Sequence, residues 1–278
     1  MTTPALIDIG ANLTHDSFDT DRNDVLAAAL AVGVDRLIVT GASEAGSTDA
    51  AALAHQRPGQ LFATAGVHPH HASDWTDTTD AHLRGLLAKP EVVAAGECGL
   101  DYFRNYSTHT QQAHAFTRQL ELAVESRKPV FLHQRDAHEP FLSLLDPMLP
   151  ALTRGVAHCF TGRGHELAAY LERDLYIGIT GWICDERRGR HLLELVGTIP
   201  DDRLMIETDA PYLLPRTLKP RPKSRRNEPR HLIEVLRVVA QARGQSEAHV
   251  AQITTANAER FFELPSAKEP DNQNPPSH

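Results

Sequence analysis

The sequence of 278 residues predicts one α/β domain, a single closed (β/α)8 barrel of the TIM type. Short runs of β-branched and apolar residues alternate with longer helical stretches, which is typical of parallel strands joined by crossover helices. Eight such units occur, and eight units in about 260 residues match the size of a closed barrel. Several strand-like runs are almost continuously apolar, as expected for strands that are buried on both faces.

The strand-like runs recur at regular intervals along the chain. An open, doubly wound sheet is the alternative architecture, but the presence of eight units rather than five or six favours the barrel. The eight expected strands occupy residues 5–8, 36–40, 61–67, 92–97, 129–133, 155–159, 175–180 and 204–207.

Helical stretches fill the intervals between these strands. The first, at 21–32, begins with acidic residues and ends at a glycine, as the start and stop signals of helices predict. The longest, at 108–127, has apolar residues at helical spacing. The other expected helices lie at 43–56, 135–145, 164–173, 186–195 and 229–243, followed by an extra C-terminal helix at 246–262.

The barrel domain is expected to occupy residues 1–264. Residues 265–278 are polar and Pro-rich, so we expect a disordered tail that cannot bury enough apolar surface to fold. The longest apolar runs are far shorter than the ~20 residues of a membrane span, and no basic residue precedes the first of them, so neither a membrane partner nor a secretory signal is expected. Three widely spaced cysteines fit a reducing cytoplasm better than a disulfide framework.

Residues of the metal-ligand type stand where most of the predicted strands end. In a barrel, the C-terminal ends of the strands meet around one cavity, which is where catalytic groups lie. A mixture of carboxylates and imidazoles suits a divalent cation, because oxygen ligands favour Mg²⁺ and Mn²⁺ and imidazole favours Zn²⁺. One histidine at a strand end is usually a core residue, whereas several such residues at successive ends predict a metal centre. They are Asp8, His68, Glu97, His133, His158 and Asp209.

Other residues beside these strand ends either contribute to the active site or serve only in packing. Asp209 follows the last strand, so we expect it to act as a general base on a metal-bound water or as a further ligand. Cys98 and Cys159 adjoin predicted ligands, and because adjacent strand residues point to opposite faces, both thiols are expected to pack against the outer helices. For three further residues both functions stay open: His70, His71 and Trp182.

The distribution of charge adds a second prediction. The formal net charge of −8 argues against a protein that coats nucleic acid. However, residues 216–230 hold seven of the 28 Lys and Arg and one of the 36 Asp and Glu, which gives this segment +6 and the rest −14. Loops after the last barrel strands often bind phosphate, for which the arginine fork is suited, although a solvated basic loop is the alternative. Substrate contacts are therefore expected from Arg225 and Arg226, and near the metal from Arg135 and His68.

Six short motifs occur in order along the chain. They are DIGANL at 8–13, GVHPH at 66–70, GECGLD at 96–101, HQRDAH at 133–138, HCFTG at 158–162 and ETDAPY at 207–212. As a set they resemble the TatD family of metal-dependent deoxyribonucleases, over about residues 5–262. The segments at 177–188 and 224–229 resemble one branch of that family in particular.

This resemblance implies a barrel of the amidohydrolase type and a Mg²⁺-dependent nuclease, with Mn²⁺ or Zn²⁺ as substitutes in vitro. For that branch it implies 3′-to-5′ exonuclease action on single-stranded DNA and RNA, a role in DNA repair and oxidative damage, and a monomer. The family's bridging carboxylate corresponds to Glu97, its metal-binding histidines to His133 and His158, and its strand-eight aspartate to Asp209.

The first motif departs from the pattern of many relatives, which carry Asp-x-His-x-His there. This chain has Gly10 and Asn12 in place of the two histidines. Glycine has no side chain to offer, and an amide oxygen is a weaker ligand. One of two metal positions is therefore expected to be depleted, and the preference to move from Zn²⁺ toward Mg²⁺ or Mn²⁺.

Two rival functions remain on the sequence alone. Amidohydrolase-type barrels also hydrolyse small phosphorylated, amide or ester substrates, because function depends on the site and not on the fold. The basic segment disfavours a neutral small substrate. A protein that only binds a partner is the second rival, and it leaves the ligand-type residues at the strand ends without a purpose.

Overall fold

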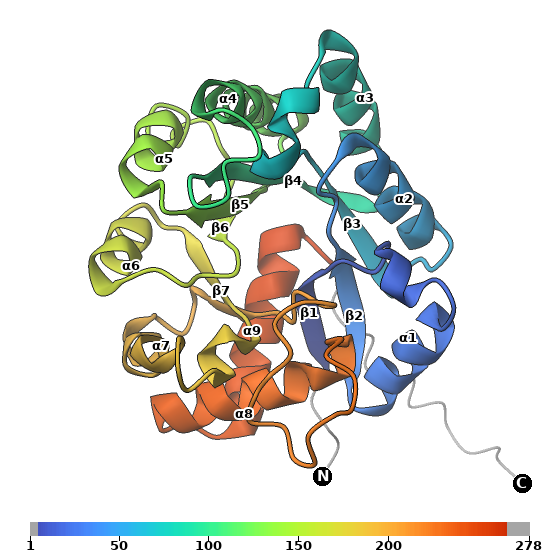
Figure 1. Cartoon of the computed structure of the whole chain (residues 1–278), viewed down its shortest axis with the longest axis vertical. Coiled ribbons are helices and arrows are strands. Elements are labelled where there is room, and N and C mark those ends of the chain that lie inside the picture. Colours follow the sequence, from blue (N-terminus) through green and yellow to red (C-terminus); the bar gives the residue numbers. More distant parts are fainter. Residues whose placement is uncertain (1–4, 266–278) are drawn as a thin grey trace, which may run out of the picture.

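The computed structural model describes residues 5–265, and this part of the chain forms the predicted barrel. Eight parallel strands pair in sequence order, from β1 to β8, inside a ring of helices (Figure 1). The open doubly wound sheet is thereby excluded. The strands are β1 (Leu6–Ala11), β2 (Val34–Val39), β3 (Leu61–Ala65), β4 (Val92–Asp101), β5 (Val130–Arg135), β6 (Gly155–Ala157), β7 (Tyr176–Ile179) and β8 (Leu204–Ile206).

The barrel is nearly closed between its first and last strands. Ala11, at the end of β1, forms a parallel bridge with Ala210, just after β8. On either side of this bridge the backbone N–H of Asp209 donates to the carbonyl of Gly10 at 2.8 Å, and that of Asn12 donates to Ala210 at 2.7 Å. These bonds hold the end of strand one against the residues that follow strand eight.

All eight predicted helices are present among residues 5–265, together with one that the sequence reading missed. The missed helix, α3, is rich in Thr and Asp, so its apolar stripe is short. Its start signal is nevertheless clear, since Thr76 and Thr79 form a capping box. The helices are α1 (Arg22–Ala31), α2 (Glu44–His55), α3 (Asp77–Leu87), α4 (His109–Ser126), α5 (His138–Leu145), α6 (Gly164–Leu171), α7 (Arg190–Leu195), α8 (Leu232–Arg243) and α9 (Glu247–Phe262).

Strands β4 and β5 reach further than predicted. The two strands pair as far as Asp101 and Arg135, so β4 continues four residues beyond Glu97. This extension lifts Asp101 and Arg135 to the rim of the barrel. It also delays the start of the next helix, because Arg135 is still in the strand and Asp136 adopts a positive φ of 53°.

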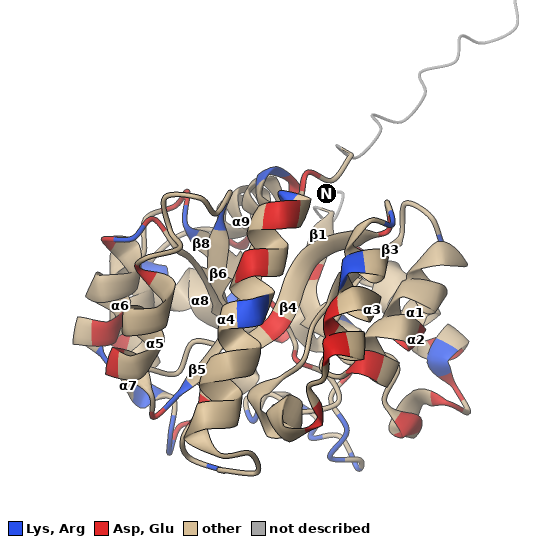
Figure 2. Ribbon diagram, turned by 90° about the horizontal axis from the view of Figure 1, so that it is seen from above, with Lys and Arg blue, Asp and Glu red and all other residues tan. Residues whose placement is uncertain are grey.

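The core has two layers, one inside the barrel and one between the strands and the helices. The inner layer includes Ile9, Phe131 and Met205, and α9 closes it from the end at which the strands begin, with Phe261 and Phe262. Figure 2 shows the start of β1 and α9 at the same end of the barrel, and loops with Lys and Arg among Asp and Glu at the other. The end at which the strands finish is therefore the one left for a site.

Two sequence predictions concern the edges of the chain. The predicted tail, 265–278, lies outside the described residues except for Pro265, so the domain boundary stays a prediction. Among residues 5–265, none of the helices combines the length and the apolar character of a membrane span.

Candidate active site

A cavity of about 610 Å³ opens where the strands end, and the predicted ligand residues meet in it. Its lining includes residues from the ends or following loops of β1, β3, β4, β5, β6 and β8, so the barrel brings together side chains that are far apart in the sequence. Of the predicted site residues, those that line it are His68, Glu97, His133, Arg135, His158 and Asp209.

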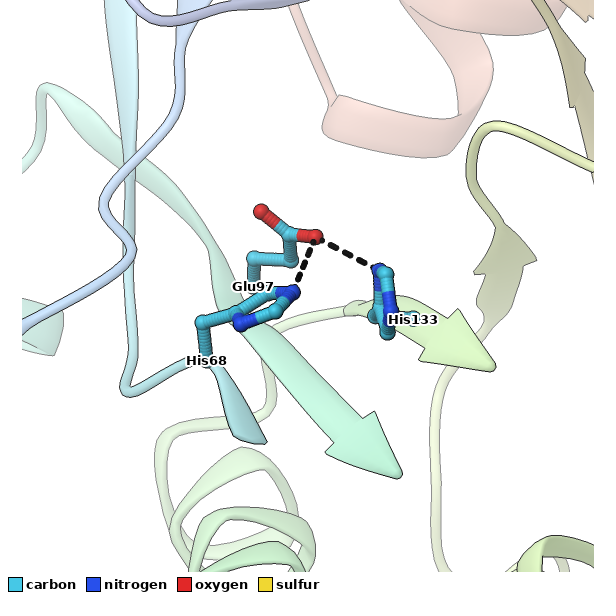
Figure 3. A group of neighbouring side chains, drawn as sticks. All are labelled: His68, Glu97 and His133. Atoms are coloured by element: carbon cyan, nitrogen blue, oxygen red, sulfur yellow. Dashed lines mark ion pairs between the residues drawn. The ribbon is translucent and has the colours of Figure 1, made fainter. Parts of the chain in front are cut away.

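Glu97 lies at the centre of this cavity. Its Oε1 atom is 2.9 Å from Nε2 of His158, 3.0 Å from Nδ1 of His133 and 3.4 Å from Nε2 of His68. Figure 3 shows His68 and His133 converging on that oxygen. One ligand atom from each of His68, Glu97 and His133 lies within 4.8 Å of the others. The sequence predicted His68 both as a ligand-type residue and as a substrate contact, and the geometry places it in the ligand cluster.

The charges of this cluster stabilise one another. Burial raises the pKa of Glu97, but the imidazoles of His158, His68 and His133 outweigh that effect and hold it well below its usual range. Burial lowers the pKa of His158, but the carboxylates of Glu207 and Glu97 raise it well above its ordinary value. For His68 burial dominates, and its pKa falls well below the ordinary value. Glu97 is therefore an anion surrounded by imidazoles.

The donor set fits a divalent cation. Nε2 of His133 is buried and makes no hydrogen bond to the described residues, although it lies 3.5 Å from Oδ2 of Asp101. An imidazole nitrogen of this kind, beside a buried carboxylate, is free to act as a ligand. Mixed carboxylate and imidazole sites are typical of divalent cations, from Mg²⁺ and Mn²⁺ to Zn²⁺.

Two further carboxylates contact ring nitrogens of histidines that line the cavity. Oε2 of Glu207 lies 3.1 Å from Nδ1 of His158, and Oδ2 of Asp101 lies 2.9 Å from Nε2 of His70. Such partners set the orientation and the tautomer of metal-binding imidazoles. The sequence reading included Glu207 and Asp101 only as parts of motifs. Their acidic character directly beside predicted strand ends was the signal that could have identified them.

Strand one offers no imidazole, and the structure explains why. A side chain at Gly10 would collide with the carboxylate of Glu207, which fills that space. Asn12 uses its amide Nδ2 to donate to Oδ1 of Asp209 at 3.0 Å. Burial raises the pKa of Asp209 to about 7, since the nearby carboxylates of Glu97 and Glu207 oppose the lowering effect of His158. Asn12 therefore holds Asp209 in place.

Two expectations about residues at the strand ends are wrong. Asp8 was expected to face the cavity, but its carboxylate is fully buried, and it accepts hydrogen bonds from the backbone and hydroxyl of Thr208 at 2.9 and 2.5 Å. It therefore fastens strand one to the segment after strand eight. Cys98 packs in the outer core as expected, but Cys159 lines the cavity, because its positive φ of 46° interrupts the strand alternation.

Three of the seven cations in the basic segment 216–230 pair with carboxylates of the chain itself: Arg216, Arg226 and Arg230. Arg226 pairs with Asp21 at 2.6 Å and with Glu228 at 3.0 Å, and its guanidinium lies 4.9 Å from the centroid of the Phe18 ring. Neither Arg226 nor Arg225 lines the cavity. Their expected contact with phosphate therefore stays a prediction.

Other cations and several aromatic rings line the cavity instead. Arg104, Arg135 and Arg188 come from three different loops or strand ends, and the sequence reading missed the first and the last. The guanidinium carbon of Arg188 lies 4.4 Å from the centroid of the Trp182 ring. His70, His71 and Trp182, whose roles the sequence left open, all line the cavity.

The geometry agrees with comparisons to known proteins. A model of the family described as TatD-related DNase matches residues 7–263. The chain belongs to the TatD-related DNase family. The TatD family resemblance seen in the six motifs is thereby confirmed, and it assigns the chain to the nuclease class of hydrolases.

Individual TatD-family proteins cover almost the whole chain. It is 53% identical over 261 residues to a protein of Erwinia billingiae named 3′-5′ ssDNA/RNA exonuclease TatD, covering 94% of this chain and 100% of that one. It is 54% identical over 257 residues to a protein of the same name from Cronobacter sakazakii, covering 92% and 97%. A solved TatD homologue from Escherichia coli has a TM-score of 0.85 at 26% identity, covering 95% and 100%.

Proposed function

We propose that this chain is a divalent-cation-dependent nuclease that removes nucleotides from the 3′ end of single-stranded DNA and RNA. The arrangement of Glu97 among three imidazoles, in a cavity lined by arginines, carries the proposal. The polarity and the choice of single strands rest on its likeness to the exonucleases of Erwinia billingiae and Cronobacter sakazakii.

Mg²⁺ is the proposed cation, with Mn²⁺ and Zn²⁺ as substitutes. Glu97, His133 and His158 would hold it, together with His68, which clusters with Glu97 and His133, and with Asp209 as a further ligand. When bound, such a cation polarises a phosphoryl oxygen and lowers the pKa of a bound water. The lack of strand-one imidazoles supports Mg²⁺ or Mn²⁺ over Zn²⁺.

The chain's own residues supply the remaining chemistry. Asp209, with a pKa raised by burial to about 7, is suited to take a proton from the attacking water near neutral pH. Asn12 fixes the orientation of its carboxylate through the hydrogen bond to Oδ1. Arg104, Arg135 and Arg188 offset the negative charge that develops on the phosphoryl oxygens. The 3′-terminal nucleotide would leave as a 5′-monophosphate.

We propose that the enzyme acts in DNA repair and oxidative-damage responses, in the cytoplasm and as a monomer. A small phosphorylated, amide or ester substrate is the alternative, and the arginine-lined cavity favours a phosphodiester over a neutral compound.

A product ladder from end-labelled oligonucleotides, single- and double-stranded, tests this proposal with Mg²⁺, Mn²⁺ and Zn²⁺ in turn. We expect mononucleotides to be released stepwise from the 3′ end of single strands. Glu97→Ala and His158→Ala should abolish this digestion, while the surface variant Glu172→Gln should retain it. Full activity in both site variants, or hydrolysis of simple esters in preference to oligonucleotides, would refute the proposal.

A further inference from the structure

A second cavity of about 630 Å³ adjoins the metal-site cavity. The two share five lining residues, so they adjoin along the ends of β5, β6 and β7. The shared residues are Gln134, Arg135, His158, Thr161 and Arg188. His158 is part of the ligand cluster, so the second cavity begins at the candidate metal centre and extends away from it.

The mouth of this space carries features that suit a nucleobase. The guanidinium carbon of Arg135 lies 3.9 Å from the centroid of the Phe103 ring, and 52% of Phe103 is exposed. Five large apolar or aromatic side chains are exposed among residues 5–265, and the three aromatic ones, Phe103, Tyr106 and Tyr212, all line one of the two cavities. Aromatic rings and guanidinium planes are the surfaces on which single-stranded bases stack.

The part of the second cavity that the metal-site cavity does not share is lined by three carboxylates, of Asp136, Glu166 and Glu194, and by one guanidinium, of Arg163. Glu166 already accepts hydrogen bonds from Gln134 and from the backbone of Arg163, whereas Glu194 is exposed and has no ion pair with the described residues. A carboxylate accepts a hydrogen bond from a hydroxyl and repels a phosphate. This part of the cavity therefore suits the 3′-terminal hydroxyl of a nucleic-acid strand better than a further phosphate of that strand.

We propose that the second cavity binds the 3′-terminal nucleoside of the strand, with its base against Phe103 and Arg135 and its free 3′-hydroxyl facing Glu194. This inference rests on the proposed function and explains its polarity. The scissile phosphate then lies at the shared residues, beside His158 and Arg135. The retained strand leaves on the other side, over the exposed Tyr106 and Tyr212.

The state of the 3′ end provides the first test. The metal-loaded enzyme is given two single strands that differ only in a 3′-hydroxyl or a 3′-phosphate. We expect the hydroxyl strand to be digested about tenfold faster, and Glu194→Gln to narrow that ratio by about threefold. The matched control, Glu172→Gln directly after α6, should keep the wild-type ratio. Equal rates on both strands, or no effect of Glu194→Gln, would overturn the inference.

The terminal base provides the second test, with a measurement that does not depend on activity. Thymidine 5′-monophosphate and inorganic phosphate are titrated into the protein by calorimetry in the presence of EDTA. We expect Phe103→Ala to weaken the mononucleotide about tenfold, in line with the contribution of one stacked base, and to leave phosphate unchanged. Leu30→Ala, which removes an exposed apolar side chain on α1, is the control. Equal affinity of wild type for both probes would contradict the inference.

Failure of the terminal subsite and failure of the proposed function give different results. If the metal-loaded wild type releases no nucleotides from any strand, the proposed function is wrong. If it digests strands but ignores the 3′ group, and Phe103→Ala binds the mononucleotide as wild type does, only the terminal subsite is wrong.

Discussion

Glu207 lies directly beside Gly10 inside the barrel, so that any side chain at position 10 would collide with its carboxylate. The same carboxylate contacts Nδ1 of His158 at 3.1 Å and accepts a hydrogen bond from the backbone of Cys159. One buried group therefore fills the space beside strand one and orients an imidazole of the candidate metal centre. The absence of a histidine at position 10 and the position of Glu207 are two aspects of one packing arrangement.

The first prediction concerns that packing. Gly10→Ala should lower the free energy of unfolding by about 1–3 kcal/mol, because its Cβ overpacks a filled core. Gly10→His should bind no additional metal, because Glu207 occupies the space that the imidazole needs. Urea denaturation and metal analysis by mass spectrometry measure the two effects.

The chain contains a matched control for this substitution. A Cβ at Gly85, in α3, meets no atom outside its own helix within 4 Å, so Gly85→Ala should be neutral or stabilising. A stable Gly10→His protein with one more bound metal than wild type would show that Glu207 moves aside without cost.

The second prediction concerns Glu207 as a positioning residue. Glu207→Gln keeps the shape of the side chain but removes the charge that faces Nδ1 of His158. Loss of such a partner typically weakens metal binding by about 10- to 100-fold. Calorimetric titration with Mn²⁺ should therefore show a higher Kd. Glu234→Gln, which changes another buried glutamate that does not line the cavity, should leave the Kd unchanged. An unaltered Kd in the Glu207 variant would show that Glu207 does not position His158 for metal binding.

The third prediction concerns pH. Because burial raises the pKa of Asp209 to about 7, its carboxyl is protonated below that pH in the metal-free protein, and the proton competes with a cation for it. Apparent affinity for Mn²⁺ should therefore rise through about pH 7 more steeply than loss of the His158 proton alone would produce, because the pKa of that ligand is also raised. In Asp209→Asn this part of the pH dependence should disappear, whereas the exposed Asp136→Asn should retain it. A slope through pH 7 as steep in Asp209→Asn as in wild type would assign the titration to another group.

The fourth prediction separates the cavity arginines from the basic segment. Arg135→Ala and Arg104→Ala should weaken binding of a single strand and make it less sensitive to salt. The slope of log affinity against log salt should fall by roughly 0.7 for each phosphate that is no longer neutralised. Arg226→Ala should mainly destabilise the fold, because it breaks the pairs with Asp21 and Glu228. Filter binding at several salt concentrations and thermal unfolding measure the two effects. If Arg226→Ala binds the single strand more weakly but is as stable as wild type, Arg226 contacts phosphate, as the sequence predicts.

The architecture and the ligand-type residues at the centre of the site could be predicted from the sequence alone, whereas two of the cavity arginines, Arg104 and Arg188, were missed. Runs of apolar residues at a strand period, separated by helical stretches, depend on local chemistry and on burial, and both are visible along the chain. The barrel geometry then requires the ends of its strands to converge, so the order of residues was enough to place Glu97, His133, His158 and Asp209 in one cavity. Only α3, whose apolar stripe is short, was missed among the helices of residues 5–265.

The tertiary structure decided which way each polar side chain faces and which partner it takes. Asp8 stands at a predicted strand end, as the ligand residues do, but its carboxylate accepts a hydrogen bond from Thr208. Because Thr208 is 200 residues away in the chain, this contact could not be predicted from the sequence. Arg226 belongs to the most basic segment yet pairs with Asp21, while Arg135 reaches the cavity because β4 and β5 pair further than their apolar runs predict. Side-chain direction depends on backbone torsion and on neighbours that are distant in the chain, and only the folded structure brings those neighbours together.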